Sequence, residues 1–246
     1  MDESPPPEPE PESLRLRQLF AQKLHDLPVE TRESMAVTAA EPVLSALCFD
    51  PLPAVVAKLL SNERFGLTQA RLVAAHHPHP SGLQNLAARE AFLRDGEVQR
   101  LLLRNVQLPP GVLQRILAPK RLLEVYKLCI SRELPEKNQR AARDALRHKF
   151  ANTAAPDDKV ELLFHTEGRV LALLIGLPLD QKTGAILGAR TYTSLLLVQN
   201  LARWAPTPPG VLAHLLKEAV VKHNPQVRAL LLQHPNMPHH ARHSGG

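Results

Sequence analysis

The chain has few aromatic residues, and Ala and Leu dominate its apolar content. Phe, Tyr and Trp together make up 4% of the 246 residues, whereas apolar residues as a whole make up 44%. Aromatic and β-branched residues favour strands, while Ala and Leu favour helices. This balance predicts an all-α protein, and the length is sufficient for a substantial core.

Cysteines and long apolar runs are also scarce. The two cysteines, Cys48 and Cys129, each lie in a short apolar stretch and form no Cys-x-x-Cys pair. We therefore expect buried thiols in a reducing compartment, with no disulfide framework. No signal of the basic-then-apolar type opens the chain, and no segment approaches the roughly 18 apolar residues of a membrane span. We expect a cytoplasmic protein that does not enter a membrane.

Motifs for catalysis are absent as well. The sequence contains no Gly-x-Ser-x-Gly, no His-Glu-x-x-His and no paired-carboxylate motif. The stretch KTGAILGA (182–189) lacks the glycine that precedes a phosphate-loop lysine, and we interpret it as a loop running into a helix. The sequence predicts a protein that is not an enzyme and needs no cofactor.

The 23 prolines have two distinct roles. In the first 12 residues they alternate with acidic residues, which predicts a disordered tail because such a segment buries too little apolar area to order itself. Elsewhere most of them stand where a helix could begin, because proline has no N–H to lose in the first turn.

An apolar pattern recurs after several of these prolines. Apolar or small residues follow two, three, six and seven positions later, and residues four apart lie on one face of a helix. This pattern predicts short amphipathic helices in four copies: Val55, Val56, Leu59 and Leu60; Gly82, Leu83, Leu86 and Ala87; Val112, Leu113, Ile116 and Leu117; Val211, Leu212, Leu215 and Leu216.

A second helix is predicted after each of these. Asp95 precedes Val98 and a run of three leucines, and Asn224 precedes Val227 and a similar run. Asp and Asn side chains accept hydrogen bonds from the free N–H groups of a first helical turn. Weaker copies begin near Thr68, Leu122, Thr166 and Thr191.

The spacing of the prolines indicates a repeat architecture. The anchors lie 21 to 31 residues apart, and the copies after Pro135, Pro156 and Pro178 lack the full apolar pattern: Pro53, Pro80, Pro110, Pro135, Pro156, Pro178, Pro209 and Pro238. One helix pair cannot bury its apolar face alone, so repeats of this length stack on their neighbours. We predict a right-handed α-solenoid over residues 51–238, with capping helices at 13–50 and a disordered tail at 239–246.

These repeats resemble a known family. Pro-Pro-x-Val-Leu-x-x-Leu, Asn-Pro-x-Val-Arg-x-Leu-Leu and His-Pro-x-x-Pro are similar to the leucine-rich repeat variant and to short HEAT-like repeats of bacterial α-solenoids. The resemblance covers Pro51 to Pro238 and implies a fold rather than an activity. Some proteins with such repeats carry a cysteine-rich iron–sulfur segment before them, and this chain has no cysteine cluster that would imply one.

Histidines gather in two turns, around 76–79 and 234–243. Imidazoles this dense can bind a transition metal. However, His76 and His234 each precede an anchor proline by four residues, and other copies have Asn105 or Ser131 near this point. We therefore expect His76 and His234 to satisfy backbone carbonyls at a helix C-terminus.

Basic residues are concentrated in the middle of the chain. Between residues 115 and 149 there are ten bases and four acids, and the bases at 140, 143 and 147 share one helical face. Such a stripe could follow a phosphate backbone, contact an acidic protein or simply be solvated. The candidate contacts for a partner or for phosphates are Arg132, Lys137, Arg140, Arg143, Arg147 and Lys149.

Two functions remain open from the sequence. The first is a non-catalytic helical-repeat scaffold that binds another protein, for which an acidic protein is one candidate. The alternative is a sequence-independent nucleic-acid-binding protein that uses the basic stripe at 115–149, although no interleaved aromatic residue offers a stacking platform for bases.

Overall fold

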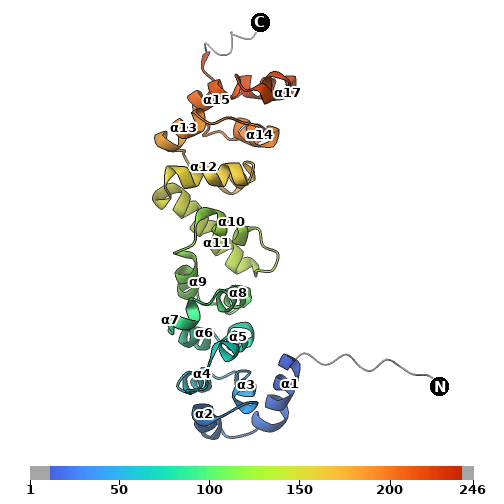
Figure 1. The fold of residues 1–246 in the computed structure, drawn as a ribbon, viewed down its shortest axis with the longest axis vertical. Coiled ribbons are helices and arrows are strands. Elements are labelled where there is room, and N and C mark those ends of the chain that lie inside the picture. The colour runs from blue at the N-terminus through green and yellow to red at the C-terminus, as the bar shows by residue number, and fades with distance from the viewer. Residues whose placement is uncertain (1–11, 240–246) are drawn as a thin grey trace, which may run out of the picture. The chain divides into compact units, whose positions relative to one another are not determined.

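The computed structural model describes residues 12–239 (Figure 1). The tails predicted at 1–12 and 239–246 lie outside this range, except for Glu12 and His239. Every regular element within it is a helix, and these residues contain no strand, which confirms the all-α prediction. None of the helices described there is both long and apolar enough to cross a lipid bilayer.

The chain divides into two compact units. Unit 1 extends to Ala118 and also contains Arg132–Asn138, whereas unit 2 contains Pro119–Ser131 and continues from Gln139. The helix α11 (Glu136–His148) therefore contributes its first residues to unit 1 and the remainder to unit 2.

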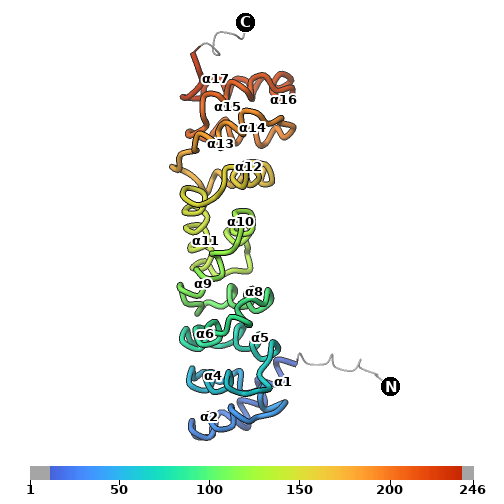
Figure 2. The backbone as a smooth tube through the Cα atoms, turned by 60° about the vertical axis from the view of Figure 1, so that its left-hand side comes forward, coloured from blue at the N-terminus to red at the C-terminus, as the bar shows by residue number. Residues whose placement is uncertain are grey.

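Unit 1 consists of two rows of short helices. One row contains α2, α4 and α6, which pack in that order, and the other contains α3, α5 and α8 (Figures 1 and 2). Its elements are α1 (Glu12–Leu19), a π-helical turn (Phe20–Leu24), α2 (Val29–Thr38), α3 (Val43–Leu47), α4 (Pro53–Leu59), α5 (Leu67–His76), α6 (Pro80–Ala87), α7 (Glu90–Leu93), α8 (Gly96–Arg104) and α9 (Pro110–Leu117).

Unit 2 has a similar arrangement. The helices α12, α13 and α15 pack in sequence, as do η3, α14 and α17, and α12 also contacts α10 (Figure 2). Its elements, besides α11, are α10 (Leu122–Cys129), a π-helical turn (Lys149–Thr153), α12 (Pro156–His165), the 3-10 helix η3 (Arg169–Leu173), α13 (Gln181–Gly188), α14 (Leu195–Arg203), α15 (Pro209–Leu215), α16 (Ala219–Lys222) and α17 (Pro225–Leu232).

Five of the eight anchor prolines mark helix starts as expected, whereas Pro178 lies three residues before the start of α13. Pro53, Pro80, Pro110, Pro156 and Pro209 are each the first residue of a helix. Proline is tolerated at this position because its N–H would have no helical partner, and its fixed φ suits the first turn.

The predicted apolar faces form the core. Among the four copies after Pro53, Pro80, Pro110 and Pro209, all the apolar and small residues are buried except Leu60 and Leu216, which are half-buried. The predicted caps are also confirmed: the side chain of Asp95 accepts from the Val98 N–H at 2.9 Å, and that of Asn224 accepts from the Val227 N–H at 3.2 Å.

Four local predictions need correction. Two one-turn helices were not predicted: α7 lies between α6 and α8, and α16 lies between α15 and α17. The copy beginning near Thr166 forms a 3-10 helix, because Glu167 and Gly168 both adopt positive φ and delay the helix start. The capping segment at 13–27, whose apolar spacing predicts one helix with Leu16, Leu19, Phe20 and Leu24 inward, is interrupted by a π-helical turn and buries Phe20 and Leu24 but not Leu16 and Leu19. Finally, Lys182 lies within α13 rather than in a loop.

Buried asparagines connect successive helices. Nδ2 of Asn62 donates to the carbonyls of Ala36 and Ala39, both at 3.0 Å, at the end of α2. Nδ2 of Asn105 donates in the same way to the carbonyls of Ala74 and His77, at the end of α5. These bonds satisfy carbonyls that a helix end leaves without a partner.

Histidine replaces asparagine in two of these turns. Nε2 of His234 lies 3.1 Å from the Trp204 carbonyl at the end of α14, as predicted. The prediction for His76 is wrong: this ring is exposed and stacks on Phe49. Its neighbour His77 is the buried residue, with Nδ1 3.1 Å from the carbonyl of Asp50.

Candidate functional site

The basic residues selected from the sequence fall in both units. In unit 1, Arg132 is exposed in the turn before α11, and Nζ of Lys137 donates to the Leu108 carbonyl at 3.3 Å. Lys137 is exposed and also bonds to a carbonyl of its own unit.

The other four lie on α11 or directly after it, within unit 2. Arg140 is exposed, and Lys149 is half-buried where the π-helical turn begins. The Arg143 guanidinium donates to Oε1 of Gln139 at 3.1 Å, and its Nε atom is buried. A side chain held in this way has fewer donors available for a partner.

Arg147 has a structural role. Its Nη1 atom donates to the carbonyls of Leu173 at 2.8 Å and Ile175 at 3.1 Å, just after η3. Arginine is well suited to such a position because its donors form a rigid fork. Arg140, Arg143 and Arg147 do share one helix, and Arg143 and Arg147 donate to acceptors within the protein.

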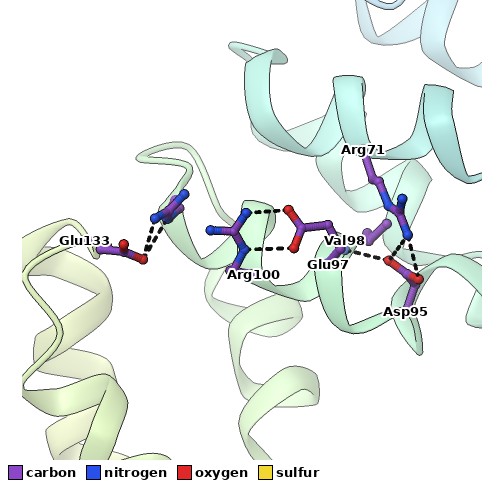
Figure 3. Close-up of polar contacts among 7 residues, drawn as sticks. Arg71, Asp95, Glu97, Val98, Arg100 and Glu133 are labelled. Carbon is purple, nitrogen blue, oxygen red and sulfur yellow. Dashed lines mark hydrogen bonds and ion pairs between the residues drawn. The ribbon is translucent and has the colours of Figure 1, made fainter.

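On the surface of unit 1, the charged side chains along α5 and α8 pair with one another. Figure 3 shows Arg71 facing Asp95, with 3.2 Å from Nη2 to Oδ2, and Arg100 facing Glu97 at 2.5 Å. The hydrogen bond from the Val98 N–H, followed by that from Arg71, lowers the pKa of Asp95. Because these opposite charges are paired, this surface presents little net charge to a partner. Exposed ion pairs of this kind contribute little to the stability of the protein.

A recess lies along α12 in unit 2. A cavity of about 470 Å³ opens on one side of this helix, between α12 and the turn after α13. It is lined by Asp157, Val160, Glu161, Phe164, His165 and Arg190.

A second cavity, of about 380 Å³, opens on the side facing α10. Glu161 lines both cavities, and together we call them the α12 groove. The second cavity is lined by Arg121, Leu122, Leu123, Glu124, Asp158, Glu161 and Leu162.

The α12 groove combines apolar walls with an excess of acid. Its lining contains four carboxylates and two guanidiniums. Three exposed side chains, Asp157, Glu161 and His165, repeat every four residues and so stand in line on one face of α12. Nε2 of His165 lies 3.3 Å from Oε1 of Glu161, and Phe164 provides an aromatic wall beside them.

Aromatic packing supports this wall from behind. The ring centroids of Phe164 and Tyr192 lie 5.3 Å apart. The hydroxyl of Tyr192 donates to the Leu187 carbonyl at 2.9 Å, and burial raises the pKa of this phenol. Tyr192 is therefore a neutral packing residue at physiological pH.

The polar groups of the α12 groove are carboxylates, guanidiniums and the imidazole of His165. None of the described residues lining its two cavities is Ser, Thr, Cys or Lys. Cys129 is buried elsewhere in unit 2, and burial raises its pKa to about 11, which makes it unreactive. Within residues 12–239, no group of three His, Cys, Asp or Glu side chains is placed to hold a metal ion.

The α12 groove was not among the surfaces predicted from the sequence. A signal was available in PDDKVELLFH (156–165), where polar residues recur every four positions beside the apolar residues Val160, Leu162, Leu163 and Phe164. That pattern also describes an ordinary solvated face, and only the packing of α10 and α13 against α12 creates the cavities. Comparisons with protein-family models, curated proteins and solved structures found no match to this chain.

Proposed function

We propose that the protein is a non-catalytic helical-repeat scaffold that binds another protein. The proposed architecture is a right-handed α-solenoid of short repeats similar to the leucine-rich repeat variant. Support comes from the two rows of short helices in each unit and from the recurring turn contacts of Asn62, Asn105 and His234. Stacked repeats of this kind present an extended, pre-organised surface.

The α12 groove is the observation that carries the proposal. It places apolar walls from Val160 and Phe164 next to the carboxylates of Asp157, Asp158 and Glu161. A partner segment that carries Lys or Arg beside an apolar residue matches both features. Charge complementarity of this type sets orientation and association rate more than affinity.

The nucleic-acid alternative has weaker support. Phosphate contacts need basic side chains with donors directed to solvent. Lys137, Arg143 and Arg147 each donate to an acceptor within the protein. If this alternative were correct, changing Arg140, Arg143 and Arg147 to Gln would lower the log–log salt slope of duplex binding by about 2 to 3.

Affinity capture from a native lysate separates the two functions. Glu161→Arg reverses the charge shared by both cavities, and Glu63→Arg makes the same change at an exposed residue of unit 1. We expect the wild type and Glu63→Arg to retain the same proteins, and Glu161→Arg to lose them. Nuclease treatment should leave this result unchanged.

Two outcomes contradict the proposal. Equal capture by Glu161→Arg and Glu63→Arg would show that the α12 groove is not the binding surface. Loss of all captured protein after nuclease treatment would show that nucleic acid is the primary partner.

A further inference from the structure

A smaller cleft in unit 2 has the opposite electrostatic character. It has a volume of about 230 Å³ and lies between η3 and α14. Its walls include Arg169, Ile175, Asn200, Arg203 and Trp204. None of these residues lines the α12 groove, so this cleft is a separate feature.

Cationic side chains dominate the cleft. Arg169 and Arg203 are both exposed, one from each wall. A third guanidinium, from Arg147, is fixed nearby because it donates to the carbonyl of Ile175. Oε2 of Glu167 lies 3.1 Å from Nη2 of Arg169. The described residues that line the cleft include two arginines and no carboxylate.

Trp204 supplies an independent indication of a ligand. Its side chain is 5% exposed, and its Nε1 atom is buried without a hydrogen-bond acceptor. A buried N–H without an acceptor is unfavourable, and most such groups in proteins are paired. Trp204 also lines the cleft that Arg169 and Arg203 line.

The floor of the cleft is rigid. Gly168 has a φ of +74°, and a Cβ at this position would lie 2.8 Å from Cβ of Asn200. Nδ2 of Asn200 donates to the Glu167 carbonyl at 2.8 Å, which links α14 to the turn before η3. A cleft held in this way is formed before a ligand arrives, which lowers the entropy lost on binding.

Size and charge together define the ligand. The volume lies below the roughly 300 Å³ at which pockets for drug-sized molecules begin, so a single side chain fits better than a cofactor. Glu167 already neutralises part of the charge, which favours a monoanion over a phosphate dianion. Ile175 is 69% exposed at the rim and offers apolar contact for a methylene stem.

We propose that this cleft binds the carboxylate side chain of an acidic segment from a partner protein. Arg169 and Arg203 pair with the carboxylate, and the indole N–H of Trp204 provides a further donor. The site is separate from the α12 groove, and its test uses no component of the groove proposal.

Trp204 makes the test direct because it is the chain's single tryptophan. The full-length protein is titrated with a capped Ala-Glu-Leu-Glu-Ala peptide, and tryptophan emission and calorimetric heat are recorded in parallel. We expect saturable binding that weakens with added salt. The matched Gln peptide should bind at least about 10-fold more weakly, because charge-assisted hydrogen bonds are lost.

Variants then assign the binding to the cleft. Arg169→Gln with Arg203→Gln should weaken peptide binding by at least about 10-fold. Lys217→Gln with Lys222→Gln removes the same charge from exposed positions that do not line the cleft, and it should bind like the wild type. Trp204→Phe, followed by calorimetry, should weaken binding while circular dichroism remains that of a folded protein.

Four results would overturn the proposal. The first is the absence of a saturable signal in both measurements, and the second is equal binding of the Glu and Gln peptides. The third is an equal loss of affinity in the two charge variants. The fourth is displacement of the peptide by inorganic phosphate at a concentration lower than that at which the peptide itself half-saturates the protein. The last result would assign the cleft to phosphate instead of carboxylate.

Discussion

Replacing Asn105 by Ala should destabilise the protein far more than its single side chain suggests. The Asn105 side chain makes three hydrogen bonds: Nδ2 donates to the carbonyls of Ala74 at 3.0 Å and His77 at 3.1 Å, and Oδ1 accepts from the Gln107 N–H at 2.8 Å. The residue is 8% exposed, so water replaces these partners poorly.

The magnitude follows from those three bonds. A hydrogen bond contributes about 1 kcal/mol net, and a buried group left without a partner costs about 1 to 3 kcal/mol. Allowing for partial rescue by water at the turn, we expect Asn105→Ala to lower the free energy of unfolding by about 2 to 4 kcal/mol. Asn105→His should lower the free energy of unfolding by less than Asn105→Ala does, because His77 and His234 bond to carbonyls in equivalent turns.

Urea unfolding followed by circular dichroism measures the effect, with the midpoint falling and the slope unchanged. Asn152→Ala is the matched control, since exposed Asn152 makes one bond, to the carbonyl of His148 in the preceding turn, and should cost less than about 0.5 kcal/mol. Equal losses in the two variants would refute the structural role assigned to Asn105.

Two further predictions concern a glycine contact and an ion pair. Gly82→Ala should cost about 1 to 3 kcal/mol in the same urea assay, because its Cβ would lie 1.9 Å from Nε2 of buried His77, whereas Gly96→Ala, with no atom within 4 Å, should be nearly neutral; equal effects would contradict this contact. Burial alone would raise the pKa of Asp180, but hydrogen bonds, the first from buried Lys159 at 2.7 Å, hold it well below its usual 3.8. This depressed pKa contributes stability above pH 3.8 that is lost as the pH falls further, so Asp180→Asn should flatten the acid side of the stability profile, and an unchanged profile would contradict the assignment.

The sequence was informative wherever structure depends on neighbours along the chain. Pro110 begins a helix and Asp95 caps one because both effects operate within a single turn. Effects within one turn could not predict which of the adjacent residues His76 and His77 is buried. The buried residue is His77 because its ring packs against the carbonyl of Asp50, which is distant in sequence. The one-turn helix α7 was missed because four residues carry no apolar period.

The candidate surfaces depend on contacts distant in sequence. Arg147 looked like part of a solvated stripe, yet its acceptors, the carbonyls of Leu173 and Ile175, lie 26 and 28 residues further on. The α12 groove likewise exists only because α10 and α13 flank α12. A periodic pattern identifies the face of a helix but not the elements that will border it.

Site-specific photocrosslinking in a native lysate tests the central claim most directly. A photoreactive phenylalanine analogue replaces His165, an exposed residue lining the α12 groove, and in a control it replaces His223, an exposed residue of unit 2 outside it. The scaffold proposal predicts a discrete protein adduct at position 165 that persists after nuclease treatment, disappears when Glu161→Arg is added, and is absent at position 223. Adducts of equal yield at both positions, or an adduct at 165 that survives Glu161→Arg, would contradict binding through the α12 groove.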